Sequence, residues 1–172
     1  VATVALALPL AFEAKEPKLM RRPPRRPDAP VLSGFVVTRT FVAASLMTIG
    51  AVGLFLWEYH ASGETADAMR RGQTMAVTTV ILFQVFYVLN CRSLKGSLLS
   101  IGLWTNITAF IGIAALLLLQ LGFIYLPFMN AIFGSLPLSA RDLLVATAVG
   151  MIILPVISIE KLIRNRLDAR PM

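Results

Sequence analysis

Long stretches without a charged residue constrain this chain more than any other feature. In its 172 residues there are four of them, covering 40–57, 72–91, 96–140 and 143–159. About 20 mostly apolar residues are enough for one helix to cross the hydrocarbon core of a bilayer. With 57% hydrophobic and only 15% charged residues, the composition is that of a membrane protein. A net charge of +7 would suggest nucleic-acid binding in a soluble chain, but the apolar stretches exclude that class.

The stretches predict an all-α membrane protein whose residues 35–163 form a bundle of four full transmembrane helices. The predicted helices lie near residues 35–58, 65–91, 99–125 and 140–163. The longest stretch is long enough for more than one helix, but its second half is rich in residues that break helices. These residues are Pro127, Asn130, Gly134, Ser135 and Pro137. We therefore expect a loop there.

Three segments outside the bundle are predicted to be part of a further helix, a loop and a tail. Residues 1–12 are apolar but too short to cross a membrane alone. They predict the C-terminal half of a transmembrane helix that starts before Val1, so we expect the chain to be a fragment of a longer protein. Residues 13–34 predict a basic, proline-rich cytoplasmic loop, and residues 164–172 a cytoplasmic tail.

The positions of the basic residues predict the orientation in the membrane. If the chain crosses four times after the loop, all of its 16 Lys and Arg residues lie on one side except Arg70, Arg71 and Arg141. Basic residues near membrane spans stay in the cytoplasm. The loop, the turn that holds Arg92 and Lys95, and the C-terminus are therefore predicted to be cytoplasmic, in a multi-pass protein of the plasma membrane.

Three features predict local structure in the last helix. Ser139 and Asp142 have the spacing of a capping box, in which a hydroxyl and a carboxylate satisfy free backbone N–H groups at a helix start. Pro155 lacks a backbone N–H and predicts a kink. Near the cytoplasmic end, Glu160 and Arg164 are one turn apart and are placed to pair.

Polar residues inside the apolar stretches are candidate functional sites, because they are costly in a membrane. They are Thr78, Thr79, Gln84, Asn90, Asn106, Thr108 and Gln120. Uncharged amides and hydroxyls also bond between helices simply for packing, and we favour that role for Asn106, Thr108, Gln120, Thr78 and Thr79. His60, near acidic residues in an outer turn, is predicted to be solvated rather than a metal ligand, and Cys91 is the single cysteine.

Several ordered segments resemble the C-terminal transmembrane region of cation-transporting P-type ATPases. Residues 11–13 (AFE) and 20–25 (MRRPPR) resemble the end of the sixth helix and the loop after it. Residues 84–93 (QVFYVLNCRS) are similar to the eighth helix, and residues 127–128 with 133–138 (FGSLPL) to the stretch before the tenth. Each match is weak alone, but their order and spacing are specific.

The resemblance implies the membrane part of an ATP-driven cation pump that is not catalytic by itself. The family's phosphorylated Asp, in an Asp-Lys-Thr-Gly sequence, has no counterpart here. ATP and Mg are therefore expected only for the parent protein, and the expected partners are the bilayer, the missing helices and cytoplasmic domains, and the transported cation. The alternative is a free-standing four-helix membrane protein with a structural or regulatory role.

The resemblance also implies candidate site residues. Thr3 and Gln84 match positions that carry carboxylates in the family's calcium pumps. Ca²⁺ prefers hard oxygen ligands with balancing negative charge, so a standard calcium pair is not expected, and a monovalent ion, a proton or an altered site is equally open. Within the loop, Arg21, Arg22, Pro23, Pro24 and Arg25 have three interpretations: a charge anchor, a binder of anionic lipid, or a stiff surface that docks on the phosphorylation domain.

Overall fold

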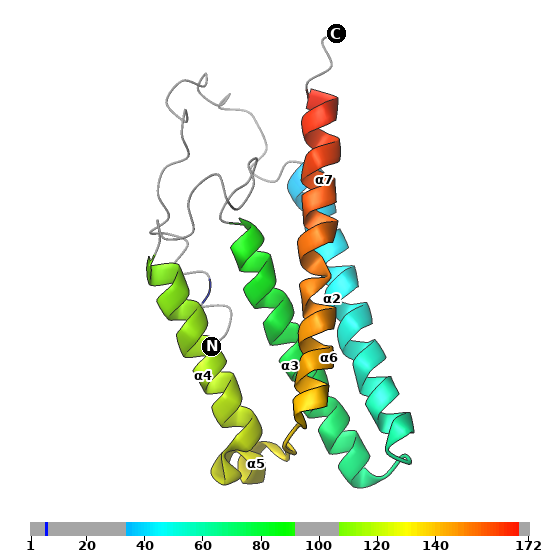
Figure 1. Cartoon of the computed structure of the whole chain (residues 1–172). Coiled ribbons are helices and arrows are strands. Elements are labelled where there is room, and N and C mark those ends of the chain that lie inside the picture. The colour runs from blue at the N-terminus through cyan, green and yellow to red at the C-terminus, as the bar shows by residue number, and fades with distance from the viewer. Residues whose placement is uncertain (1–5, 7–33, 92–106, 169–172) are drawn as a thin grey trace.

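A computed structural model describes Leu6 and residues 34–91 and 107–168, and all of the elements in these ranges are helices. In chain order they are α2 (Gly34–Ala61), α3 (Ala66–Cys91), α4 (Ile107–Tyr125), α5 (Pro127–Phe133), α6 (Ala140–Met151) and α7 (Ile153–Asp168). The long helices run up and down beside one another, and α5 lies across the end of α4 (Figure 1).

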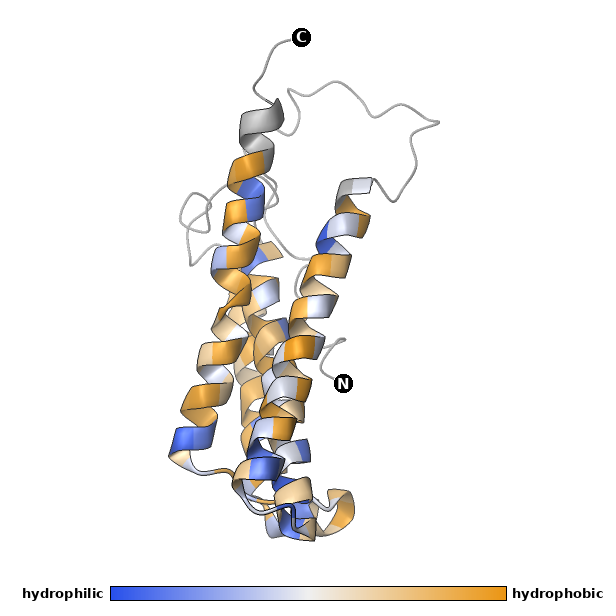
Figure 2. Cartoon of the chain, turned by 90° about the vertical axis from the view of Figure 1, so that its right-hand side faces the viewer, coloured by the Kyte–Doolittle hydropathy of each residue, from blue (hydrophilic) through white to orange (hydrophobic). Residues whose placement is uncertain are grey.

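Four helical stretches are long and apolar enough to cross a membrane. They are Val36–Ala61, Ala66–Cys91, Ile107–Tyr125 and Ala140–Ile163, the last of which combines α6 with most of α7. Hydrophobic residues cover the helices along their middles, and hydrophilic ones gather towards the ends (Figure 2). The predicted fold class, an all-α membrane bundle with four spans, is confirmed, and the chain is an integral membrane protein.

The bundle has two chemically different ends. One end, called the basic end, is where α2 starts and α7 finishes, and it carries Arg39 and Lys161. The other, called the turn end, holds the α2–α3 turn, α5 and the start of α6 (Figure 1). The α2–α3 turn is tight, with Gly63 and Glu64 both at positive φ (79° and 59°).

α3 is the central helix, because it packs against α2, α4, α6 and α7. Two glycines let its neighbours approach closely. A Cβ added at Gly72 of α3 would lie 3.1 Å from the Phe55 carbonyl oxygen of α2, and one at Gly150 of α6 would lie 3.0 Å from Leu82 Cβ of α3. Close approach at small residues is a common way for membrane helices to gain packing energy.

One apolar cluster joins all four spans near the turn end. Its buried members come from α2, α3, α4, the segment before α6, and α6 itself, namely Leu54, Met75, Ile124, Leu138 and Ala146. Met75, Ile124 and Ala146 are fully buried. Since lipid tails are as apolar as these side chains, the stabilisation comes from dispersion contacts between well-fitted surfaces.

The last span begins and breaks where the sequence predicted. The Ser139 hydroxyl accepts from the Asp142 N–H (3.2 Å), and the Asp142 carboxylate accepts from the Ser139 N–H (2.9 Å), which confirms the capping box. The helix is interrupted at Ile152, whose N–H bonds to the Val149 carbonyl three residues back. Pro155 has no N–H for the carbonyl four residues before it, which explains a break at this point.

The loop predicted for the second half of the longest stretch is wrong in part, because residues Pro127–Phe133 form helix α5. Proline is favoured at the first position of a helix, where its missing N–H needs no partner. Gly134 then ends the helix with φ 64°, a left-handed conformation that glycine adopts without strain. Two of the residues that the sequence indicated as breakers, Pro127 and Gly134, therefore act as the boundaries of α5.

Candidate functional site

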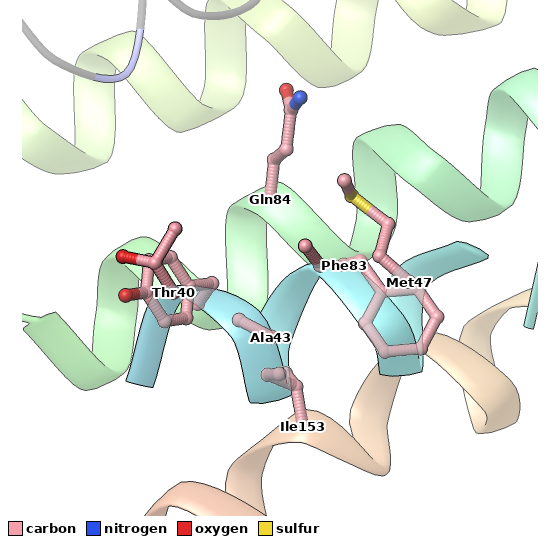
Figure 3. A pocket seen from close by; sticks show the side chains of 8 residues that line it. Thr40, Ala43, Met47, Phe83, Gln84 and Ile153 are labelled. Atoms are coloured by element: carbon pink, nitrogen blue, oxygen red, sulfur yellow. The ribbon is translucent and has the colours of Figure 1, made fainter. Parts of the chain in front are cut away.

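Gln84 lies in the middle of α3 and is half-buried. A cavity of about 240 Å³ adjoins it, lined by residues of α2, α3 and α7: Thr40, Ala43, Ala44, Met47, Phe83, Gln84, Tyr87 and Ile153. The Gln84 amide extends away from Thr40, Ala43 and Ile153 (Figure 3). It is therefore directed away from α2 and α7.

Among the residues that the structure describes, the buried Gln84 Oε1 atom has no hydrogen-bond partner. Leaving a buried amide oxygen without a partner costs about 1–3 kcal/mol, so such an atom calls for an explanation. An amide oxygen is a hard ligand of the kind that Ca²⁺ and similar cations use. The atom is thus available to a cation or to a hydrogen-bond donor.

Leu6 gives the one described contact of the N-terminal segment. It is helical and buried in an apolar cluster with Val85 and Val88 of α3 and Ile113 and Leu116 of α4. Val88 is one helical turn after Gln84, on the same face of α3. Thr3, the other predicted ion ligand, lies outside the described residues.

The other polar residues predicted in membrane stretches mostly have partners in the structure. Gln120 of α4 donates to the Thr78 hydroxyl of α3 (2.9 Å). Thr78 and Thr79 in turn donate to carbonyls one turn back in α3, at 2.7 and 2.8 Å. These bonds satisfy the side chains between and within helices, as the packing role predicts. Thr108 is exposed near the start of α4, and Asn106 lies outside the described residues.

Asn90 joins α3 to α7 at the basic end. Its amide donates to the Leu154 carbonyl (3.3 Å), while its side-chain oxygen and backbone carbonyl accept from Lys161 Nζ at 2.6 and 2.8 Å. Asn90 is next to the last residue of α3, where backbone carbonyls have no helical partner. A lysine from another helix therefore caps α3, at the end where the helix dipole favours positive charge.

Arg39 joins α2 to α7 at the same end. Its Nε and Nη2 atoms both donate to Glu160 Oε2, at 3.1 and 2.7 Å. Only 5% of the Arg39 side chain and 25% of the Glu160 side chain are exposed. Glu160 thus pairs with another helix, α2. The predicted contact of Glu160 with Arg164 stays a prediction, because the side chain of Arg164 is outside the described part.

This arrangement of Arg39, Asn90, Glu160 and Lys161, called the basic-end cluster, was not predicted from the sequence. The basic residues were interpreted as topology signals, and Glu160 was expected to pair with Arg164 of its own helix. One available signal was that Glu160 and Lys161 are adjacent and follow an apolar helix directly, so at least one of them had to face another helix or the interface.

Of the remaining predicted residues, the structure describes His60 and Cys91. His60 is exposed in the last turn of α2, with Nδ1 2.8 Å from Glu64 Oε1. Cys91 is a half-buried free thiol at the end of α3. Arg21, Arg22, Pro23, Pro24 and Arg25 lie outside the described residues.

Comparison with known proteins identifies one family along nearly the whole chain. The family described as "Cation transporting ATPase, C-terminus" matches residues 1–163. The chain is also similar to curated cation-transporting ATPases, and it covers less than a fifth of the length of each of the relatives named below.

Three relatives illustrate the range of the similarity. "Probable cation-transporting ATPase F" of Mycobacterium tuberculosis is 35% identical over 154 residues, 87% of this chain and 17% of that protein. "Cation-transporting ATPase pma1" of Synechocystis is 30% identical over 172 residues, 96% of this chain and 18% of that protein. "Calcium-transporting ATPase type 2C member 2" of Mus musculus is 32% identical over 138 residues, 80% of this chain and 14% of that protein.

These matches support the membrane part of a pump and not the alternative of a separate membrane subunit. The match spans all four described transmembrane stretches, which end at Ile163. The chain therefore belongs to the cation-transporting ATPase C-terminus family, the C-terminal membrane region of P-type ATPases.

Proposed function

We propose that this chain is the C-terminal membrane portion of a pump that moves a cation across a membrane at the expense of ATP. The family match over residues 1–163 is the observation that carries this proposal. The chain supports the transport helices and supplies at most a few ligands, while ATP and Mg bind to other parts of the same pump. The phosphorylated aspartate lies in those parts as well.

Gln84 is the proposed ion ligand of the bundle, together with Thr3 of the N-terminal segment. The buried, unpartnered Oε1 supports this role for Gln84. Leu6 supports a place for the segment next to α3, since it contacts Val85 and Val88. One of the three relatives described above is named for calcium transport, but the two proposed ligands are neutral, and Ca²⁺ sites gain affinity from carboxylates. We therefore propose the ligands only, and the identity of the transported cation has to be measured.

The proposed orientation places the basic end in the cytoplasm, with both the 13–34 loop and the C-terminus on that side of the plasma membrane. The distribution of Lys and Arg supports it. In this orientation the segment 21–25 faces the cytoplasmic domains of the pump. Its prolines stiffen it for docking there.

The proposal is tested by expressing the full-length gene and incubating membranes with radiolabelled ATP. A pump of this class transfers the γ-phosphoryl group to an aspartate, so we expect an acid-stable, hydroxylamine-labile phosphoprotein. Replacing the Asp of its Asp-Lys-Thr-Gly sequence by Asn should abolish the label. A gene that encodes no such sequence, or a protein that takes up no label, would contradict the proposal.

A further inference from the structure

The short helix α5 exposes an apolar surface at the turn end of the bundle. Leu126, Phe128, Ile132 and Phe133 are 52%, 69%, 58% and 62% exposed, and α5 buries none of its own residues. There is no charged residue between Leu126 and Leu138. An apolar surface of this kind marks a place where something other than water makes contact.

The polar groups of this connector face inward, which is the reverse of a loop in water. Ser135 is buried, and its hydroxyl donates to the Phe123 carbonyl at the end of α4 (3.3 Å). In the orientation that satisfies its amide, Asn130 donates to the carbonyls of Phe123 and Ile124, at 3.1 and 3.2 Å. The side chains that need polar partners thus find them inside the protein.

Further contacts hold the connector in place. The Leu136 N–H donates to the Thr74 hydroxyl of α3 (3.1 Å), and the Tyr125 hydroxyl donates to the Leu138 carbonyl (2.9 Å). The Phe123 and Phe133 rings pack with their centroids 5.5 Å apart. The connector is therefore fixed to the bundle, and its apolar residues have a defined outward direction.

The position of α5 along the bundle fits the boundary between headgroups and acyl chains. α5 follows the end of the membrane-length helix α4 directly and lies across it (Figure 1). At the same end, Arg141 lies over the Trp57 ring, 6.0 Å from its centroid, and Trp57 and Tyr125 are both exposed. Exposed Trp and Tyr with a nearby cation are typical of the membrane interface.

We propose that α5 is an interfacial anchor whose Leu126, Phe128, Ile132 and Phe133 insert into the lipid leaflet at the turn end. The occupant of the surface is phospholipid, because the surface follows exposed leucines of the membrane-length helix α4 (Leu118, Leu119 and Leu121) with no charged residue in between. Insertion of such a helix buries its apolar face about 5–10 Å into the leaflet. The anchor fixes the depth of the link between α4 and α6. This proposal depends on the chain lying in a membrane and does not depend on the proposed role of Gln84.

The test attaches a fluorescent NBD label to the cysteine of Phe128→Cys in the full-length pump. Cys91 is first replaced by serine, and any other cysteine of the pump is replaced as well. The pump is reconstituted with phosphatidylcholine that carries a nitroxide near the headgroup end of its acyl chain. We expect lipid nitroxide to reduce the emission by about twofold or more, since the label lies at the leaflet boundary. Aqueous iodide should quench this label weakly.

A matched control is His60→Cys, an exposed position in the last turn of α2 at the same end of the bundle. This label should show the opposite pattern, with strong quenching by iodide and weak quenching by lipid. Ile132→Cys repeats the measurement if Phe128→Cys does not fold. Strong iodide quenching at position 128 would show a surface in water, and quenching by neither agent would show a surface covered by protein. Either result would overturn the inference.

Discussion

At the residue scale, the basic-end cluster holds two buried basic side chains, Arg39 and Lys161. Arg39 and Lys161 each reach a partner on another helix, so α2 and α3 are both tied to α7. Placing charges in an apolar environment is costly, and pairing offsets that cost only when both partners are present. The cluster therefore makes the relative position of three helices depend on a few polar contacts.

A double-mutant cycle tests the Arg39–Glu160 pair. Arg39→Met and Glu160→Gln should each lower the free energy of unfolding by about 1–3 kcal/mol, because each leaves one charge without this partner. The double variant should lose less than the sum, with a coupling of about 1 kcal/mol or more. Unfolding by SDS in mixed micelles provides the measurement. Losses that add to within about 0.5 kcal/mol would show that the pair is not coupled.

The sequence predicted single residues well where their partners are local and poorly where they are distant. The Ser139–Asp142 contact spans three residues and was predicted, whereas the Arg39–Glu160 contact spans 121 residues and was not. Spacing along one helix determines local neighbours, but a distant pair depends on which helices meet. The sequence also gave no sign that the Gln84 oxygen would lack a partner while Gln120 had one.

At the element scale, glycine on α2 controls how closely that helix packs. A Cβ at Gly50 would lie 2.7 Å from Cε2 of Phe83, a ring that is 2% exposed and belongs to an apolar cluster with Ile153 and Ile157 of α7. A Cβ at Gly53, one turn later on the same helix, would meet nothing within 4 Å. The two positions form a natural test and control.

Gly50→Ala should lower the free energy of unfolding by about 1–3 kcal/mol, because the enclosed Phe83 ring has to move. Gly53→Ala should be neutral or stabilise by up to about 1 kcal/mol, because alanine favours helix more than glycine does. The same SDS titration compares them. Equal effects at the two positions would show that the contact of α2 with Phe83 does not control packing.

The elements themselves were largely predictable, and the exceptions have physical reasons. The observed bounds of α3 (Ala66–Cys91) lie close to the predicted range 65–91, because charges flank this apolar stretch on both sides. No charge marks where α4 ends, and Pro127 was interpreted as a breaker although it starts α5. A proline is compatible both with the end of one helix and with the first position of the next. The residue type alone therefore does not predict which of the two it marks.

At the scale of the whole molecule, the other three spans pack against α3, and the Gln84 amide is directed away from α2 and α7. The number of spans followed from the sequence, because membrane length and apolar composition determine it. The family was predicted from the sequence resemblance. The fold could not have predicted it, because a four-helix bundle alone indicates no activity. Only the structure shows which face of α3 carries the Gln84 amide.

The most direct test of the account is the cation dependence of ATP hydrolysis by the full-length pump with Gln84→Ala. We predict that the variant needs about tenfold more cation for half-maximal activity, which corresponds to about 1.4 kcal/mol of lost binding. Gln84→Glu, which keeps an oxygen in place, should recover much of the affinity. Gln120→Ala, the control for loss of a membrane glutamine, should leave the half-maximal concentration within about twofold of the wild type. An unchanged concentration in Gln84→Ala, or an equal shift in both alanine variants, would contradict the account.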